Sequence, residues 1–229
     1  QLAEALFEPL WQRYQANREA SRNSAYVAEA AHFARRSLQN IALSYLMLDG
    51  KAEVLAACLE QFEVCDNMTE RLAALAVLVN SPYEEEKAKA LASFAEFFKD
   101  NPLVMDQWFS VQAACRLPGA LERVQQLMQH PAFTLKNPNK VRALIGAFAG
   151  QNPVGFHQAD GSGYRFLADQ VITLNALNPQ IAARLLAPLT RWRKYDSARQ
   201  GLMRAELERI LASGELSSDV FEVVSKSLA

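Results

Sequence analysis

Hydrophobic residues recur every three or four positions along most of this chain, which is the spacing of amphipathic helices. No run of five residues alternates between apolar and polar as a half-buried strand would. The pattern predicts an all-α fold of about eleven helices and roughly 70% helix, well above the average of globular proteins. Short turns between successive helices favour antiparallel pairs stacked as an irregular α-solenoid, or superhelix. A compact orthogonal bundle is the alternative.

The first half of the chain is expected to be helical scaffold. A stripe of Leu2, Leu6, Leu10 and Tyr14 marks the first helix, and the turn at Asn23-Ser24 caps the second. That second helix is expected to carry the apolar residues Val27, Ala31, Phe33, Ala34, Leu38, Ile41, Ala42, Tyr45 and Leu46. Trp11, Trp108 and the pair Phe97-Phe98 are interpreted as core residues. No Gly-, Pro- or Ser-rich linker interrupts the chain, so residues 1–229 are expected to form one domain.

The stretch from Asn137 to Arg184 carries the strongest local signals. It holds five of the nine glycines and three Asn-Pro pairs, at 137–138, 152–153 and 178–179. Asn is a favoured N-cap and Pro suits the first helical position, so each pair predicts the start of a helix. Between the second and third starts, a special loop is expected from Gln151 to Gly163.

Composition and charge narrow the possible functions. Half of the 229 residues are hydrophobic and the net charge is −1, so no long-range field would attract nucleic acid or an anionic membrane. No apolar run approaches the ~20 residues of a membrane span. The chain begins in mid-pattern without Met or a signal peptide, and we expect a piece of a longer protein.

The cysteines and histidines do not predict a metal site. Cys58, Cys65 and Cys115 are odd in number and lack C-x-x-C spacing, which favours buried thiols in a reduced compartment over a disulfide. The three histidines lie far apart, and no H-E-x-x-H is present.

Two pairs of polar residues are candidates for binding. Gln180 and Arg184 lie four apart on the helix that follows Asn178-Pro179, so they share a face, while Leu177, Ile181 and Leu185 occupy the opposite one. Asn139 and Arg142 share a face near the start of an earlier helix. The alternatives are a solvated surface for the first pair and an ordinary salt bridge for Arg142.

Two other motifs have weak functional readings. His157 and Asp160 could suggest a catalytic pair, but turn and cap bonds by Asp160 and Ser162 are the better interpretation. The segment from Arg191 to Tyr195 mixes basic and aromatic residues that could grip single-stranded nucleic acid. It is short, and acidic residues follow it, so we interpret it as a solvated helix end.

Several long stretches together resemble a known family. They are DNMTERLAAL from Asp66, LVMDQWF from Leu103, residues 137–169, NPQIAARLLAPLTRWRKYD from Asn178, and the final LSSDVFEVVSKSLA. In this order they are similar to the C-terminal domain of bacterial aminopeptidase N, in the Gram-negative cytosolic branch of the M1 zinc metallopeptidases. The resemblance covers essentially the whole chain.

The resemblance implies a role within a larger enzyme. The parent would remove N-terminal residues from peptides, with broad preference including Ala, Arg and Lys, using zinc held in an upstream catalytic domain. This chain lacks that motif, so it would hold no zinc and have no activity alone. Its superhelix would cap the catalytic domain of the same polypeptide and enclose the peptide cavity. Gln180 would border the pocket for the first side chain, and Arg184 and Arg142 would face the bound peptide.

The resemblance also implies the partners of the chain and its location in the cell. It implies a cytoplasmic monomer that binds peptide substrates and neither nucleic acid nor membrane. The rival hypothesis is a free-standing α-solenoid adaptor that binds another protein. A stand-alone hydrolase that uses His157 is a third.

Overall fold

The structure is a computed structural model that describes residues 2–23 and 25–229, with side chains from residue 4 onward. The predicted burial of Leu2 and the part of the predicted cap that rests on Ser24 lie outside these described residues. Within them every regular element is helical, which confirms the all-α class. The chain divides into two compact units, residues 1–99 and 100–229. The single domain expected from the sequence stays a prediction.

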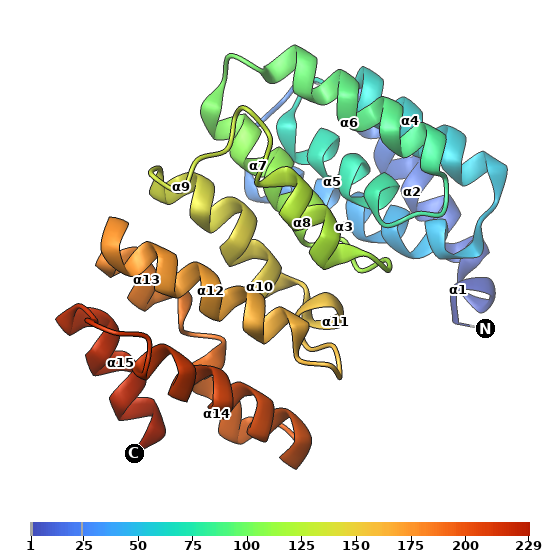
Figure 1. The fold of residues 1–229 in the computed structure, drawn as a ribbon. Coiled ribbons are helices and arrows are strands. Elements are labelled where there is room, and N and C mark those ends of the chain that lie inside the picture. Colours follow the sequence, from blue (N-terminus) through green and yellow to red (C-terminus); the bar gives the residue numbers. More distant parts are fainter. Residues whose placement is uncertain (1, 24) are drawn as a thin grey trace. The chain divides into compact units, whose positions relative to one another are not determined.

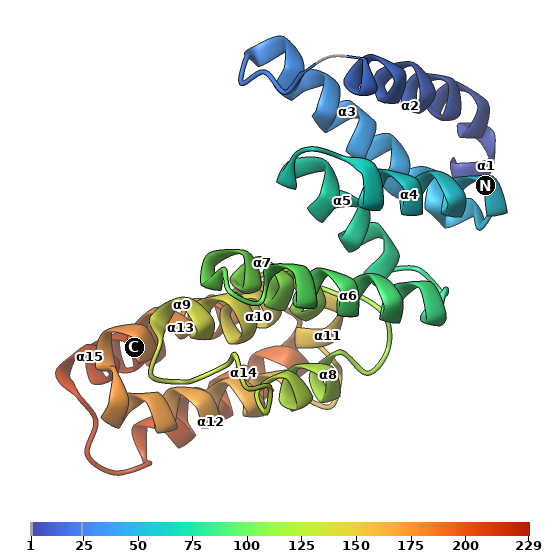
Figure 2. The same cartoon turned by 90° about the horizontal axis from the view of Figure 1, so that it is seen from above.

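The first unit is built from helices that pair with their neighbours in sequence, and α2 packs along α3 (Figure 2). Its elements are α1 (Leu2–Ala5), α2 (Phe7–Arg22), α3 (Ala30–Leu46), the 3-10 turn η1 (Met47–Asp49), α4 (Ala52–Val64), α5 (Met68–Val79) and α6 (Glu84–Phe98). Gly50 ends η1 in the left-handed conformation, and the side chain of Asn67 caps α5.

Charged and amide side chains form part of the first unit's core. Arg18 of α2 donates from Nη1 to Glu70 Oε2 at 2.9 Å, and two further nitrogens of its guanidinium bond both carboxylate oxygens of Glu60. Gln39 of α3 donates to Gln61 at 2.9 Å, and Gln61 donates to the carbonyl oxygen of Glu70 at 3.0 Å. Burial of such groups is tolerated because they satisfy one another, and the network joins α2, α3, α4 and α5.

The apolar residues expected in the second helix do not share one buried face. Ala42 and Leu46 are buried, but Phe33, Leu38 and Ile41 are exposed. The buried face of α3 follows Arg36, Gln39, Ala42, Leu43 and Leu46. Gln39 is held on this face by its hydrogen bond to Gln61.

The second unit is drawn from green to red in Figure 1. It contains the stretch from Asn137 to Arg184, which carries the strongest local signals of the sequence. Its elements are α7 (Pro102–Ala113), α8 (Ala120–Leu127), α9 (Pro138–Val141), the π-helical turn η2 (Arg142–Gly146), α10 (Ala147–Gln151), α11 (Pro153–Phe156), α12 (Ser162–Leu177), α13 (Pro179–Leu185), the 3-10 helix η3 (Leu189–Lys194), α14 (Ser197–Leu211) and α15 (Ser218–Leu228). The fifteen α-helical segments of the described residues exceed the expected eleven because turns divide several predicted helices.

The three Asn-Pro pairs between Asn137 and Arg184 begin helices, as predicted. The side chains of Asn137, Asn152 and Asn178 accept hydrogen bonds from the first-turn amides of α9, α11 and α13. Asn152 is fully buried, and its Nδ2 also donates to the carbonyl oxygens of Ala113 and Cys115, at 2.9 and 2.7 Å. Asn152 therefore joins the end of α7 to the start of α11 by hydrogen bonds.

The special loop is shorter than the sequence suggests. The predicted range Gln151 to Gly163 includes all of α11 and the first turn of α12, which leaves residues 157–161 between them. Gly161 adopts a φ of +70°, and Gly163 lies against the backbone of Phe156. Three other expected positions also differ, because Leu177 and Phe97 are exposed and Trp11 is only partly buried.

The close approach at Gly163 generates a stability prediction. A Cβ there would overlap the carbonyl oxygen of Phe156 and lie 2.9 Å from its Cα, so Gly163→Ala forces the backbone to move. We expect a loss of about 1–3 kcal/mol in the free energy of unfolding, measured by urea denaturation. The control is Gly201→Ala within α14, where a Cβ meets nothing within 4 Å and should add about 0.5–1 kcal/mol. Equal stability of the two variants would contradict the assignment.

Candidate functional site

Gln180 and Arg184 lie one turn apart on α13 and both are exposed. Neither side chain makes a hydrogen bond or ion pair with any described residue. The opposite face of α13 is anchored, since Ile181 and Leu185 are buried and Asn178 caps the helix. A short, firmly held helix thus presents an amide and a guanidinium together.

Arg142 is the first residue of the π-helical turn η2. It is exposed, and its guanidinium contacts Oδ1 of Asn139, one turn earlier. The predicted sharing of a face by Asn139 and Arg142 is therefore confirmed, and the partner of Arg142 is an amide oxygen rather than a carboxylate. Single π-helical turns within helices occur frequently at functional sites.

Gly146 brings the two candidate elements together. A Cβ at this position would lie 3.7 Å from Cδ2 of Leu185 on α13 and 3.8 Å from Cβ of Arg142 on η2. The last turn of η2 therefore packs against Leu185, on the face of α13 opposite Gln180 and Arg184. The three candidate residues lie on neighbouring elements of one unit, and each offers groups that can bind a carboxylate or a peptide carbonyl.

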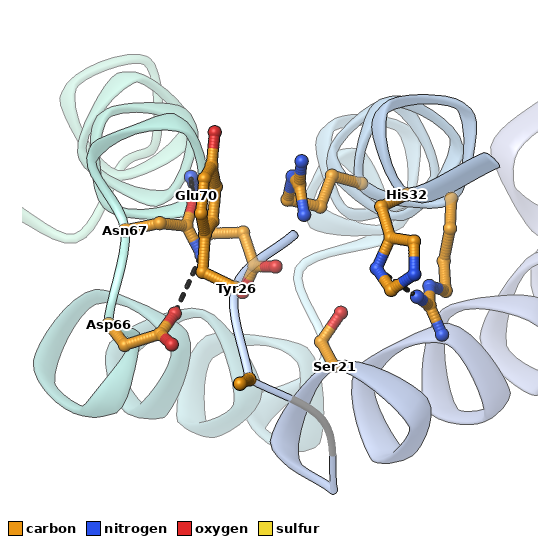
Figure 3. A pocket seen from close by; sticks show the side chains of 9 residues that line it. Ser21, Tyr26, His32, Asp66, Asn67 and Glu70 are labelled. Carbon is orange, nitrogen blue, oxygen red and sulfur yellow. Dashed lines mark hydrogen bonds between the residues drawn. The ribbon is translucent and has the colours of Figure 1, made fainter. Parts of the chain in front are cut away.

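One hollow lies in the first unit (Figure 3). Asp66 and Asn67 line one side, and His32 lies across from them. Nδ1 of His32 lies 2.7 Å from Nη2 of Arg35, and the nearby Glu70 is bonded to Arg18. Positive and negative groups compensate each other here, so the hollow selects no ligand class.

The second hollow is an open groove of about 490 Å³ between α8 and α12. Apolar and amide side chains share its walls with a serine, an arginine and one ion-paired acid. The lining residues are Leu121, Gln125, Met128, Gln129, Ser162, Arg165, Phe166, Asp169 and Gln170. Neither hollow is lined by Gln180, Arg184 or Arg142.

His157 is surrounded by tyrosines rather than paired with Asp160. Its Nδ1 lies 2.8 Å from the hydroxyl of Tyr164, and its Nε2 lies 3.0 Å from that of Tyr195. Arg199 donates twice to the backbone oxygen of His157. Burial, together with the positive charge of Arg199, lowers the pKa of His157, so the ring is neutral at pH 7. The cluster joins the 157–161 loop to α12 and α14.

Asp160 makes the turn bond that the sequence suggests, accepting from the amide of Ser162 at 2.9 Å. The weak catalytic reading of His157 and Asp160 therefore has no geometry behind it. Sequence reasoning missed Tyr164, Tyr195 and Arg199 as partners of His157, because the last two lie about forty residues away. In the local sequence, the one indication of these partners is the imidazole of His157 beside a glycine-rich turn.

The basic and aromatic segment from Arg191 to Tyr195 is largely the 3-10 helix η3. Trp192 donates from Nε1 to the carbonyl oxygen of Ser227, and Arg193 donates to the same oxygen. Both side chains thereby hold the end of α15, which supports a structural interpretation of this segment.

The thiols and the acids give no metal centre within the described residues. Cys58, Cys65 and Cys115 are all buried thiols, as predicted, and burial raises the pKa of Cys58 to about 12. No group of three His, Cys, Asp or Glu side chains among those described could hold a metal ion. No helix in the described ranges is both long and apolar enough to span a bilayer.

Known proteins resemble the chain over its whole length. A family described as a domain of unknown function, DUF3458_C, ARM repeats, matches residues 1–229. Aminopeptidase N of Escherichia coli strain K12 is 42% identical over 230 residues, which is 100% of this chain and 26% of that protein. Aminopeptidase N of Caulobacter vibrioides is 44% identical over 90% of this chain and 24% of its own length.

A solved structure is similar as well. The crystal structure of Legionella pneumophila aminopeptidase A in complex with aspartic acid has a TM-score of 0.88 and 34% identity, covering 99% of this chain and 27% of that one. The chain thus spans about a quarter of the length of the relatives that it matches. The resemblance stated from sequence is confirmed, and the ARM-repeat description agrees with a superhelix of helix pairs.

The surroundings of His157 predict a pH dependence. Because the folded chain binds this proton less readily than the unfolded chain, the free energy of unfolding falls as the pH drops below about 6.5, until the lowered pKa is reached. We expect His157→Gln to flatten this part of the stability profile, measured by urea unfolding between pH 7.5 and 5. The neighbouring Gln158→Ala serves as the control and keeps the parent slope. An unchanged slope in His157→Gln would show that the histidine is not held neutral.

Proposed function

The chain belongs to the ARM-repeat family DUF3458_C, and from this premise we propose that it is the C-terminal domain of a larger zinc aminopeptidase. The observation that carries the proposal is the length of this chain relative to that of its relatives. The whole chain matches about a quarter of aminopeptidase N, so the rest of such an enzyme would lie outside these 229 residues. The parent would remove N-terminal amino acids from peptides.

Zinc would belong to that other part of the enzyme. Hydrolysis by a zinc peptidase needs protein ligands that hold the ion and a base beside the bound water. The described residues offer no such set of ligands, and they do not fit the metal. The function of this chain is therefore to shape the substrate space of the parent rather than to carry out the chemistry.

Gln180, Arg184 and Arg142 are the residues proposed to contact substrate. Their side chains are exposed, and those of Gln180 and Arg184 have no partner among the described residues, so a ligand would not have to displace existing bonds. Gln180 offers an amide oxygen to a cationic first side chain and an N–H to an acidic one. The arginines suit a carboxylate, either a side chain or the end of a short peptide. The relative from Legionella pneumophila is in complex with aspartic acid, so acidic residues belong in any test of preference.

The proposed partners follow from the same role. The chain would pack on the catalytic domain of its own polypeptide, bind peptides, and act as a monomer in the cytoplasm of a Gram-negative bacterium. The rival, a free-standing α-solenoid adaptor, fits the same fold, because fold alone does not decide function. The reading frame separates the two, since an aminopeptidase requires an upstream H-E-x-x-H.

The isolated chain tests the division of labour. We expect residues 1–229 to bind no stoichiometric zinc and to cleave no amino-acid amide, because they hold no helical pair of histidines with a glutamate base. Metal analysis and an aminopeptidase assay on the purified chain are the measurements. The full-length protein is the positive control and should lose activity when a chelator removes its metal. Turnover by the isolated chain that survives further purification would overturn the proposal.

Substitutions in the full-length protein test the substrate contacts. Gln180→Ala should change kcat/KM for Arg relative to Ala substrates by about 2- to 12-fold, the equivalent of one neutral hydrogen bond of ~0.5–1.5 kcal/mol. Arg184→Ala should weaken a tripeptide more than a single-residue amide, because it would act beyond the first residue. Kinetics with Ala, Arg and Asp amides and a tripeptide measure both effects.

The matched controls are Gln126→Ala on α8 and Arg191→Ala on η3, which replace exposed residues of the same types in the same unit. Both controls should keep the parent ratios and the parent zinc content. If Gln180→Ala and Arg184→Ala behave like these controls, the two residues lie outside the substrate site.

A further inference from the structure

Helix α3 has two apolar sides, and among the described residues one is buried while the other is exposed. Ala42, Leu43 and Leu46 are buried in the core of the first unit. On the other side the structure exposes a second row of large apolar residues, which we name the outer α3 stripe. Its members are Leu38, Ile41, Tyr45 and, in the adjoining turn η1, Leu48.

The stripe is continuous along one face. Its residues are spaced by three, four and three positions, and helical geometry places Leu38, Ile41 and Tyr45 within roughly 60° of one another. Ile41 is 52% exposed and Leu48 is 73% exposed, so the row stands clear of the core. This spacing is that of a seam that packs against another helix.

The segment also lacks the charges of a solvated surface. No residue from 37 to 48 is Asp, Glu, Lys or Arg. Its most deeply placed polar residue, Gln39, is turned away from the stripe, fully buried and bonded to Gln61. A helix that is apolar on both sides is normally buried, and contiguous apolar patches mark interaction surfaces. The outer stripe is therefore built to be covered.

We propose that a helix of the same longer polypeptide, outside these 229 residues, covers the outer α3 stripe through an uncharged apolar face. This inference rests on the proposed function in one respect, because it needs a longer chain. The relatives are about four times as long as this chain, which leaves ample sequence to supply the helix. ARM-type repeats bury their faces on neighbours in the same chain, and an attached neighbour avoids the entropic cost of association.

Cysteine labelling measures whether the stripe is covered. Ile41→Cys places a thiol in the stripe, and Ala88→Cys places a control thiol on α6, where glutamates and lysines surround an exposed alanine. In the full-length protein we expect a maleimide to react with Ile41→Cys at least about tenfold more slowly than with Ala88→Cys, because a covered thiol reacts only when the structure opens locally. In the 229-residue chain the two rates should agree within about threefold, since both sites are exposed there.

Three results would overturn the proposal. Equal rates in the full-length protein would show that the stripe stays open. Protection in the 229-residue chain that grows with protein concentration would assign the stripe to a second copy, and protection independent of concentration would assign it to another part of this chain. Leu38→Cys repeats the measurement in case Ile41→Cys does not fold. Labelling needs no catalysis, so a full-length protein that protects the stripe but lacks aminopeptidase activity would refute the proposed function alone.

Discussion

The buried side chain of Asn152 is the constraint on which the second unit depends. Its amide group is fully buried, donates hydrogen bonds to two carbonyl oxygens at the end of α7, and caps the first turn of α11. An unpaired amide at such a depth costs far more than a paired one gains, so its partners must stay in place together. The consequence is a fixed path from α7 into the 157–161 loop.

The rest of the unit follows from that path. Gly163 lets α12 begin directly against Phe156, and the ring of His157 meets the hydroxyls of Tyr164 and Tyr195. α13 packs on α12, and through Leu185 it reaches Gly146 of η2. The candidate residues on α13 and η2 thus lie on elements whose opposite faces are held by buried contacts. A preorganised binding surface needs this support, because misplacement by even an ångström weakens recognition.

The sequence predicts best what is decided locally. The Asn-Pro helix starts depend on a few adjacent residues, and all three are confirmed. The inward face of α3 could not be predicted in this way. Its sequence carries two apolar rows, and the choice between them rests on Gln39 meeting Gln61, twenty-two residues away. The sharing of faces by Gln180 with Arg184, and by Asn139 with Arg142, follows from helical spacing alone. The approach of η2 to α13 needed the folded chain.

The π-helical turn at Arg142–Gly146 has a consequence for how this surface tolerates change. A π turn holds one residue more than the α-helical turn that would otherwise stand there, so it is equivalent to a single inserted residue within a continuous helix. Loss of one residue in this segment would restore a regular helix and rotate everything before it by about 100° relative to α10. Arg142 would then leave its present face although every side chain in the neighbourhood was retained. The face on which this arginine lies therefore depends on the number of residues in the segment. A homologous chain keeps Arg142 on this face only if it has the same number of residues here as well as an arginine at the matching position.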